Sequence, residues 1–158
     1  MANVALNSLS FENVLTTGAF NVSGAVNYHE KVMAPNGTYD PDVTNPNPAS
    51  VQVDQDAFVR FNWNQNGILT TMLAGKWKLD VFFEQMGPSE GPAIPSKLVP
   101  YESVNPKNYS VDVQIPAGTI SEGLYRVTAR LMLLPTATPG LSPICAFTDL
   151  GLIQYFNG

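Results

Sequence analysis

The amino-acid sequence predicts an all-β protein, an antiparallel β-sandwich of about seven strands with long loops rich in Pro and Asn. Three observations favour this fold class. Several segments alternate apolar and polar residues with a period of two, as strands with one buried face do. No long segment has the 3.6-residue period of a helix. Many of the 13 Pro and 12 Gly residues fall between the alternating segments, where turns are expected.

Six segments are predicted to be strands, because apolar residues, many of them β-branched or aromatic, recur at every second position. In chain order they are 20–28, 59–64, 76–83, 109–115, 124–133 and 150–156. The last segment changes phase between Leu152 and Ile153, which predicts either a β-bulge or a segment covered on both faces. Residues 4–11 are expected to add an edge strand.

The later strands are predicted to bury their odd-numbered side chains and to expose the even-numbered ones, since successive side chains point to opposite faces of a sheet. The predicted core residues are Trp77, Val81, Val113, Tyr125, Val127 and Ala129. The predicted exposed residues are Lys78, Asp112, Arg126 and Thr128.

We expect one β-sandwich domain over residues 1–158, with residues 1–17 forming either an edge strand or an arm used in assembly. Three connections between the predicted strands are long and rich in Pro. Loops of this length are often functional in compact domains. These connections are 34–50, 85–107 and 134–149.

The strand pattern resembles that of the immunoglobulin and fibronectin type III sandwiches over residues 18–156. In those folds a Trp lies in the middle of the core, and a Tyr near the start of the penultimate strand closes a corner. Trp63 or Trp77 would take the first role and Tyr125 the second. The resemblance implies an immunoglobulin-like arrangement without implying an activity, because sandwiches host many functions. The chain departs from true immunoglobulin domains in having one cysteine instead of a pair.

An immunoglobulin-like order also predicts where the connections lie. Strands that alternate in direction send every second connection to the same end of the sandwich. The connections 64–75 and 134–149 should therefore meet at one end, and the acidic segment 34–56 should emerge at the other.

The charge pattern argues against several classes of partner. The net charge is −5, from 8 basic and 13 acidic residues, and the basic residues are scattered. A chain without a basic stripe is not expected to bind nucleic acid or an anionic membrane surface. The N-terminus does not have the pattern of a signal peptide, and no apolar run is long enough for a membrane helix. Cytoplasmic localisation is therefore the default expectation, and a surface or extracellular assembly stays open.

The residues that carry catalysis are nearly missing from the sequence. The single histidine, His29, falls among polar residues at the end of a predicted strand, and Cys145 lies in an apolar stretch without a basic neighbour. We therefore expect a protein that is not an enzyme. A hydrolase that uses carboxylates, such as the pair Asp80 and Glu84, is the third hypothesis for function.

No cofactor is expected, with calcium as the one weak candidate. Four aspartates lie between Lys31 and Arg60 with no basic residue among them. Carboxylate oxygens suit calcium, but Asp also stabilises turns, and the spacing is not that of an EF-hand loop. The turn interpretation is preferred. The four residues are Asp40, Asp42, Asp54 and Asp56.

The preferred function is that of a structural or protein-interaction module that assembles with itself or with another protein. The two terminal segments carry no charge, and uncharged edge strands readily pair with another chain. The alternative is a carbohydrate-binding module, either dependent on calcium or independent of it. The predicted interaction residues are Val4, Leu6, Leu9, Phe11, Tyr155 and Phe156.

Overall fold

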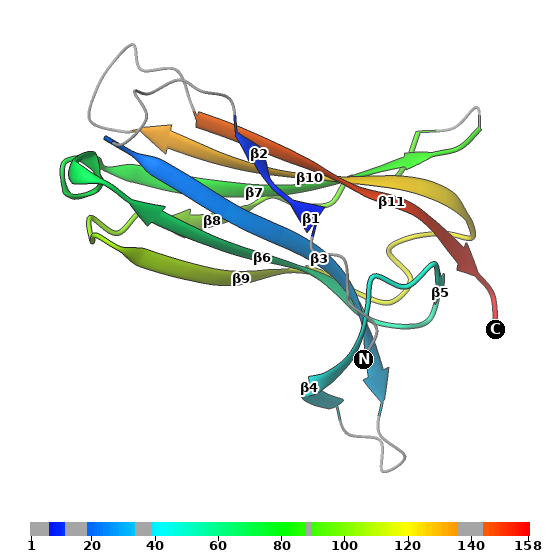
Figure 1. Ribbon diagram of the computed structural model, residues 1–158. Helices are drawn as coiled ribbons and strands as arrows, with labels where there is room; N and C mark the ends of the chain where they lie inside the picture. The colour runs from blue at the N-terminus through cyan, green and yellow to red at the C-terminus, as the bar shows by residue number, and fades with distance from the viewer. Residues whose placement is uncertain (1–6, 12–18, 34–38, 88–89, 136–143) are drawn as a thin grey trace.

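Two β-sheets pack face to face in a computed structural model that describes residues 7–11, 19–33, 39–87, 90–135 and 144–158 (Figure 1). The predicted all-β, sandwich-like architecture is confirmed. The described residues form eleven strands, of which seven have eight or more residues. The only helical element in these ranges is the short 3₁₀ helix η1 (Ile68–Thr71), and no described helix could cross a membrane.

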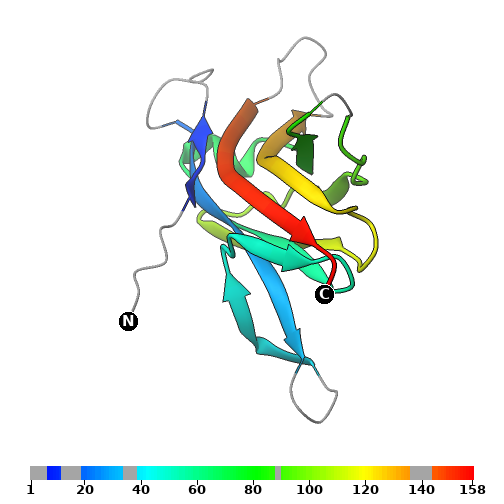
Figure 2. The same ribbon diagram turned by 90° about the vertical axis from the view of Figure 1, so that its right-hand side faces the viewer.

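The first sheet has the strand order β1-β3-β6-β9, with β4 paired to β3 beside this path. All of its pairings are antiparallel. Its strands are β1 (Asn7–Ser8), β3 (Asn21–Met33), β4 (Tyr39–Pro46), β6 (Ala57–Asn66) and β9 (Lys107–Ile115). Figure 2 shows β4 and the end of β3 projecting beyond the two layers.

The second sheet has the order β2-β11-β10-β7-β8 and is antiparallel along this path. One further strand, β5, pairs with β11 in parallel. The strands are β2 (Ser10–Phe11), β5 (Ser50–Gln52), β7 (Gly75–Gln85), β8 (Lys97–Pro100), β10 (Gly123–Pro135) and β11 (Ile144–Phe156). The six segments predicted to be strands correspond to β3, β6, β7, β9, β10 and β11, with Phe20 alone lying one residue before β3.

The core lies between the sheets and contains every residue predicted for it: Trp77, Val81, Val113, Tyr125, Val127 and Ala129 are all buried. Of the residues predicted to be exposed, Arg126 is exposed, whereas Lys78, Asp112 and Thr128 are half-buried. One tryptophan from each sheet meets the other edge to face, with the ring centroids of Trp63 and Trp77 5.7 Å apart. The alternation pattern therefore assigned the buried face correctly.

A β-bulge interrupts β11, but not where the sequence pattern placed it. Val127 of β10 pairs with Gly151, and Thr128 pairs with Asp149, so Leu150 is the extra residue. Gly151 has φ of 87°, a left-handed conformation that favours glycine. The predicted site between Leu152 and Ile153 is wrong because Leu152 is 53% exposed and not part of the core.

The ends of the sandwich are arranged as the strand alternation predicts. Gly75, which follows the β6–β7 connection, pairs with Pro135 at the end of β10, so both lie at the same end. Figure 1 shows β4 and the end of β3 at the opposite end. The start of β10 is fastened locally, because the buried Tyr125 hydroxyl donates to the Ser121 carbonyl at 3.0 Å.

Candidate functional site

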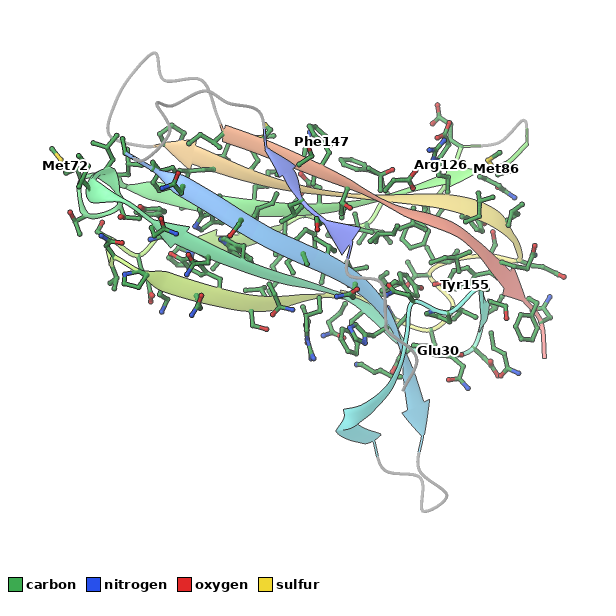
Figure 3. The ribbon with its side chains drawn as sticks, in the orientation of Figure 1. Glu30, Met72, Met86, Arg126, Phe147 and Tyr155 are labelled. Atoms are coloured by element: carbon green, nitrogen blue, oxygen red, sulfur yellow. The ribbon has the colours of Figure 1, made fainter. Side chains whose placement is uncertain are left out.

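The outer face of the second sheet gathers exposed apolar side chains. Of the nine large apolar side chains that the described part of the chain leaves exposed, six lie here, on or beside β7, β8, β10 and β11. Figure 3 shows two of them, Phe147 and Met86, projecting from the side that faces away from the first sheet. We call this surface the apolar face; it consists of Phe82, Met86, Leu98, Leu124, Phe147 and Leu152.

A desolvated ion pair lies in the middle of the apolar face. The Arg130 guanidinium donates to the Asp80 carboxylate from Nε at 2.9 Å and from a terminal nitrogen at 2.6 Å. Its carbon lies 5.1 Å from the centre of the Phe82 ring, within cation–π range. The Ser96 hydroxyl also donates to Asp80. Without this pairing, each charge would lie unpaired in apolar surroundings, at a large cost in desolvation free energy.

A second ion pair, between Arg126 and Asp149, lies farther along the same face and is more exposed. The Arg126 guanidinium bonds to the Asp149 carboxylate and holds the pKa of that carboxyl below its usual range, helped by the backbone N–H of Gly151. The register places Arg126 between Glu84 and Leu152 on the neighbouring strands. The apolar face therefore has a polar component, and its described arginines are paired.

The outer face of the first sheet is built of neutral amides instead. Side-chain amides follow one another in a chain in which Asn21 donates to Asn66 at 3.1 Å, Asn66 to Asn64 at 3.0 Å, and Asn64 to Asn108 at 2.7 Å. Asn62 lies on the same side of β6 and is exposed. We call these residues the amide face: Asn21, Asn62, Asn64, Asn66 and Asn108.

A shallow depression of about 480 Å³ opens on the amide face. Its lining combines the amides with Ser23, Ser110 and parts of Trp63 and Tyr109. Groups of this kind donate and accept hydrogen bonds without carrying charge. The depression could therefore hold a neutral, hydroxyl-rich molecule.

The predicted interaction residues are divided between the core and undescribed segments. Leu9 and Tyr155 are buried inside the domain, where their side chains pack into its own core. Phe156 is half-buried. Phe11 pairs with Ala146 through β2, and its side chain is not described. Val4 and Leu6 lie outside the described residues.

Tyr155 instead joins the two sheets. Its hydroxyl bonds to that of Tyr28 on β3, and both rings pack against Phe83. Burial raises the pKa of Tyr155 to about 12 and raises the pKa of Tyr28 even more. Both hydroxyls therefore stay protonated at neutral pH, as a buried hydrogen bond between them requires.

The four predicted metal candidates show no metal site where they are described. Asp56 accepts a hydrogen bond from the backbone N–H of Ala117 at 2.8 Å, which suits the turn interpretation. Asp54 is exposed, and Asp40 and Asp42 lie in β4, where side chains are not described. Among the residues whose side chains are described, no three His, Cys, Asp or Glu side chains gather as metal ligands would.

His29, Cys145 and Asp80, which were considered for catalysis, are each packed or paired within the domain. The ring of His29 stacks on that of Phe58 with centroids 4.9 Å apart. Burial, together with the positive charge of Arg60, lowers the pKa of His29. Cys145 is a half-buried thiol opposite Met132. The carboxylate of Asp80, considered for a hydrolase, is occupied by Arg130 and Ser96.

Comparisons with known proteins found no match that indicates a function. No protein-family model matches the chain, and no curated protein matches it at a significant level.

The apolar face escaped the sequence prediction, although a signal for it was present. Phe82, Leu124 and Leu152 are apolar residues at positions that the alternation pattern assigns to solvent. Each one alone is unremarkable, because single exposed apolar residues are common on protein surfaces. Only the strand register, which places Thr128 beside Phe82 and Arg126 beside Leu152, brings them together.

Proposed function

We propose that the protein is a non-enzymatic interaction module that assembles with itself through the apolar face. One observation carries the proposal: six of the nine exposed large apolar side chains of the described residues lie on one face of one sheet. Exposed apolar side chains that gather on one face in this way are a mark of interaction sites, although here charged and polar side chains lie among them. Aromatic and arginine side chains, here Phe82, Phe147 and Arg130, are also the residue types enriched at protein interfaces.

Charge along β7 favours a second copy as the partner. Lys76 and Lys78 lie toward the start of this strand, and Glu84 lies toward its end. Consider two copies whose apolar faces lie against each other, related by a two-fold axis. If this axis is perpendicular to the strands and passes at the level of Val81, Lys78 of each copy lies opposite Glu84 of the other. The same operation sets Leu134 opposite Leu124. Such an isologous contact satisfies the symmetry of a homodimer.

The size of the face suits a stable contact. β7 has 11 residues, so at roughly 3.4 Å per residue the face is about 37 Å long. The three strands β7, β10 and β11, spaced by roughly 4.8 Å, make it about 14 Å wide. Two such faces bury about 1,000 Å² in total, the level that separates biological contacts from most lattice contacts. β8, whose residues are mostly exposed, adds to this area.

We also propose that the sandwich is of the immunoglobulin type, as the sequence pattern suggested. The order β3-β6-β9 in one sheet and β8-β7-β10-β11 in the other supports this assignment. The hydrogen bond from Tyr125 at the start of β10 to the Ser121 carbonyl further supports it, because the tyrosine corner of such folds bonds in this way. The assignment concerns the architecture, and the argument for function remains with the apolar face.

The decisive measurement is the native mass by sedimentation at tens of micromolar protein. The wild type should sediment as a dimer, and combining Phe82→Ser with Phe147→Ser should yield a monomer. Met72→Ser is the matched control, since Met72 is more exposed than either phenylalanine but lies outside the apolar face. A monomeric wild type, or a dimer that survives the double substitution, would overturn the proposal.

Charge exchange tests the two-fold geometry separately. Glu84→Lys alone should weaken the dimer because it faces Lys78 of the second copy, and adding Lys78→Glu should restore the dimer. If the combined Glu84→Lys and Lys78→Glu substitutions do not restore association, the two-fold arrangement is wrong. The apolar face itself is tested only by the phenylalanine substitutions.

A carbohydrate-binding module is the second candidate, and the amide face favours it. Amides and hydroxyls around the 480 Å³ depression could pair with sugar hydroxyls. Titration with a panel of neutral oligosaccharides, followed through the amide resonances of Asn62 and Ser110, tests this candidate. Binding that Asn62→Ala weakens would support it, and an unresponsive depression would remove it.

A further inference from the structure

We infer that the open edge of β9, together with the groove beside it, binds an extended peptide that carries a carboxylate and adds to the first sheet as a strand. This site borders the apolar face at Leu98, which also lines the groove, but binding there does not depend on self-assembly. Three observations lead to it: an edge with outward-facing backbone groups, an adjoining groove, and a lysine beside both.

β9 is the last strand of the first sheet in the described order, and only β6 pairs with it there. In an antiparallel sheet the main-chain groups of successive residues point alternately to one side and the other. The Asp112 carbonyl points away from β6, since it accepts from Lys97 Nζ at 3.0 Å. The main-chain groups of Asn108, Ser110 and Gln114 therefore point to the same open side.

This edge is long enough to hold a peptide. β9 spans nine residues, and four of them present their N–H and C=O groups outward. Strand addition uses such groups for affinity, whereas pockets beside the edge select alternate side chains of the peptide. Edges of this length in soluble proteins are usually protected, and here Lys97 is the one described side chain that donates to the open side of β9.

A groove of about 610 Å³ runs beside the second half of β9. One wall is the segment that leads into β8, including Ile94 and Pro95, and the other includes Val113 and Pro116. A strand added to β9 would direct every second side chain toward this groove, between the edges of the two sheets. The largely apolar walls suit aliphatic side chains at those positions.

Charge defines the third feature of the peptide. The Lys97 ammonium donates to the neutral Asp112 carbonyl, while the Asp112 carboxylate is bound by Arg60. The Asp80 carboxylate, which follows the register partner Leu79 of Lys97, is bound by Arg130. Lys97 is exposed and can turn from the carbonyl toward a ligand. A carboxylate on the peptide would pair with it and fix the register of the added strand.

The test uses a capped eight-residue peptide of alternating valine and threonine with one central glutamate, and its glutamine counterpart. Titration into ¹⁵N-labelled protein should shift the amide resonances of Ser110, Asp112 and Gln114. Gln114→Pro should weaken binding about tenfold, because it removes one outward N–H that the peptide would use. Gln114→Thr keeps this N–H and should bind like the wild type.

Lys97→Gln provides the second arm, on a residue whose exposure makes it safe for folding. It should abolish the preference for the glutamate peptide over the glutamine peptide while leaving the amide shifts in place. Sedimentation of the same variants should be unchanged, which separates this site from the apolar face. The inference is overturned if neither peptide shifts the β9 amides at millimolar concentration, or if Gln114→Pro binds as the wild type does.

Discussion

Each outer face of the sandwich carries an arginine that is paired with an aspartate of a neighbouring strand and lies over a phenylalanine ring, Arg60 over Phe58 on one face and Arg130 over Phe82 on the other. On the first sheet Arg60 binds Asp112 beside the amide face, and the side chains are 34% and 28% exposed. On the second sheet Arg130 binds Asp80 within the apolar face, and they are 24% and 7% exposed. The same chemistry is half-exposed at both residues on the first face, whereas on the second face the carboxylate of Asp80 is buried.

The comparison predicts its largest effect at Asp80. Asp80→Asn keeps the shape of the side chain but leaves the Arg130 guanidinium without its counter-charge in a poorly hydrated place. Breaking a buried pair in this way costs about 3–5 kcal/mol. The free energy of unfolding from urea denaturation measures the loss.

Asp112→Asn is the matched control on the other face. It makes the same chemical change in a more exposed pair, for which we expect a loss of about 1 kcal/mol or less. Equal losses from the two substitutions would show that the two ion pairs do not differ in hydration.

The amide face should respond to a smaller change. Asn64 accepts from Asn66 and donates to Asn108, so Asn64→Ala interrupts the chain of amides. We expect a loss of about 0.5–1.5 kcal/mol in the free energy of unfolding, the usual contribution of a hydrogen bond near a surface. Asn62→Ala, on the same face of β6, removes an amide outside this chain and should cost less. A greater loss at Asn62 would contradict the arrangement.

The sequence was sufficient to predict the long strands, because each buries one face and so alternates cleanly. Trp77 and Tyr125 were placed correctly for this reason. Short strands gave no such signal: β8 has four residues, and β4 contains Pro41 and Pro46, which resemble loop residues. β4 and β8 form strands because they pair with β3 and β7, and the residues of a short segment alone do not indicate such partners.

The candidate surfaces were harder to predict than the fold. The absence of charge near Leu9 and Tyr155 suggested a contact with another subunit, but an uncharged segment is equally suited to the protein's own interior. Phe82 and Phe147 belong to strands that β10 separates within the sheet. Their common location depends on register, which alternation leaves undetermined.

The smallest predicted effect concerns His29, which belongs to the first sheet and lies close to Arg60. Burial first, and then the charge of Arg60, lowers the pKa of His29 below its ordinary value of 6.5. The folded state thus prefers the neutral ring, while the unfolded chain takes up a proton near 6.5. The stability that this preference contributes is complete above pH 6.5 and is lost as the pH falls through the folded pKa.

The urea midpoint should therefore decrease modestly between pH 7 and pH 5.5, a range in which ordinary carboxyls have not yet taken up protons. His29 is the only histidine in the chain, so His29→Gln should remove most of this slope. Because the apolar face contributes no histidine, its association should not follow the same titration. A midpoint that rises toward pH 5.5, or a slope that persists in His29→Gln, would contradict the assignment and place the titrating group elsewhere.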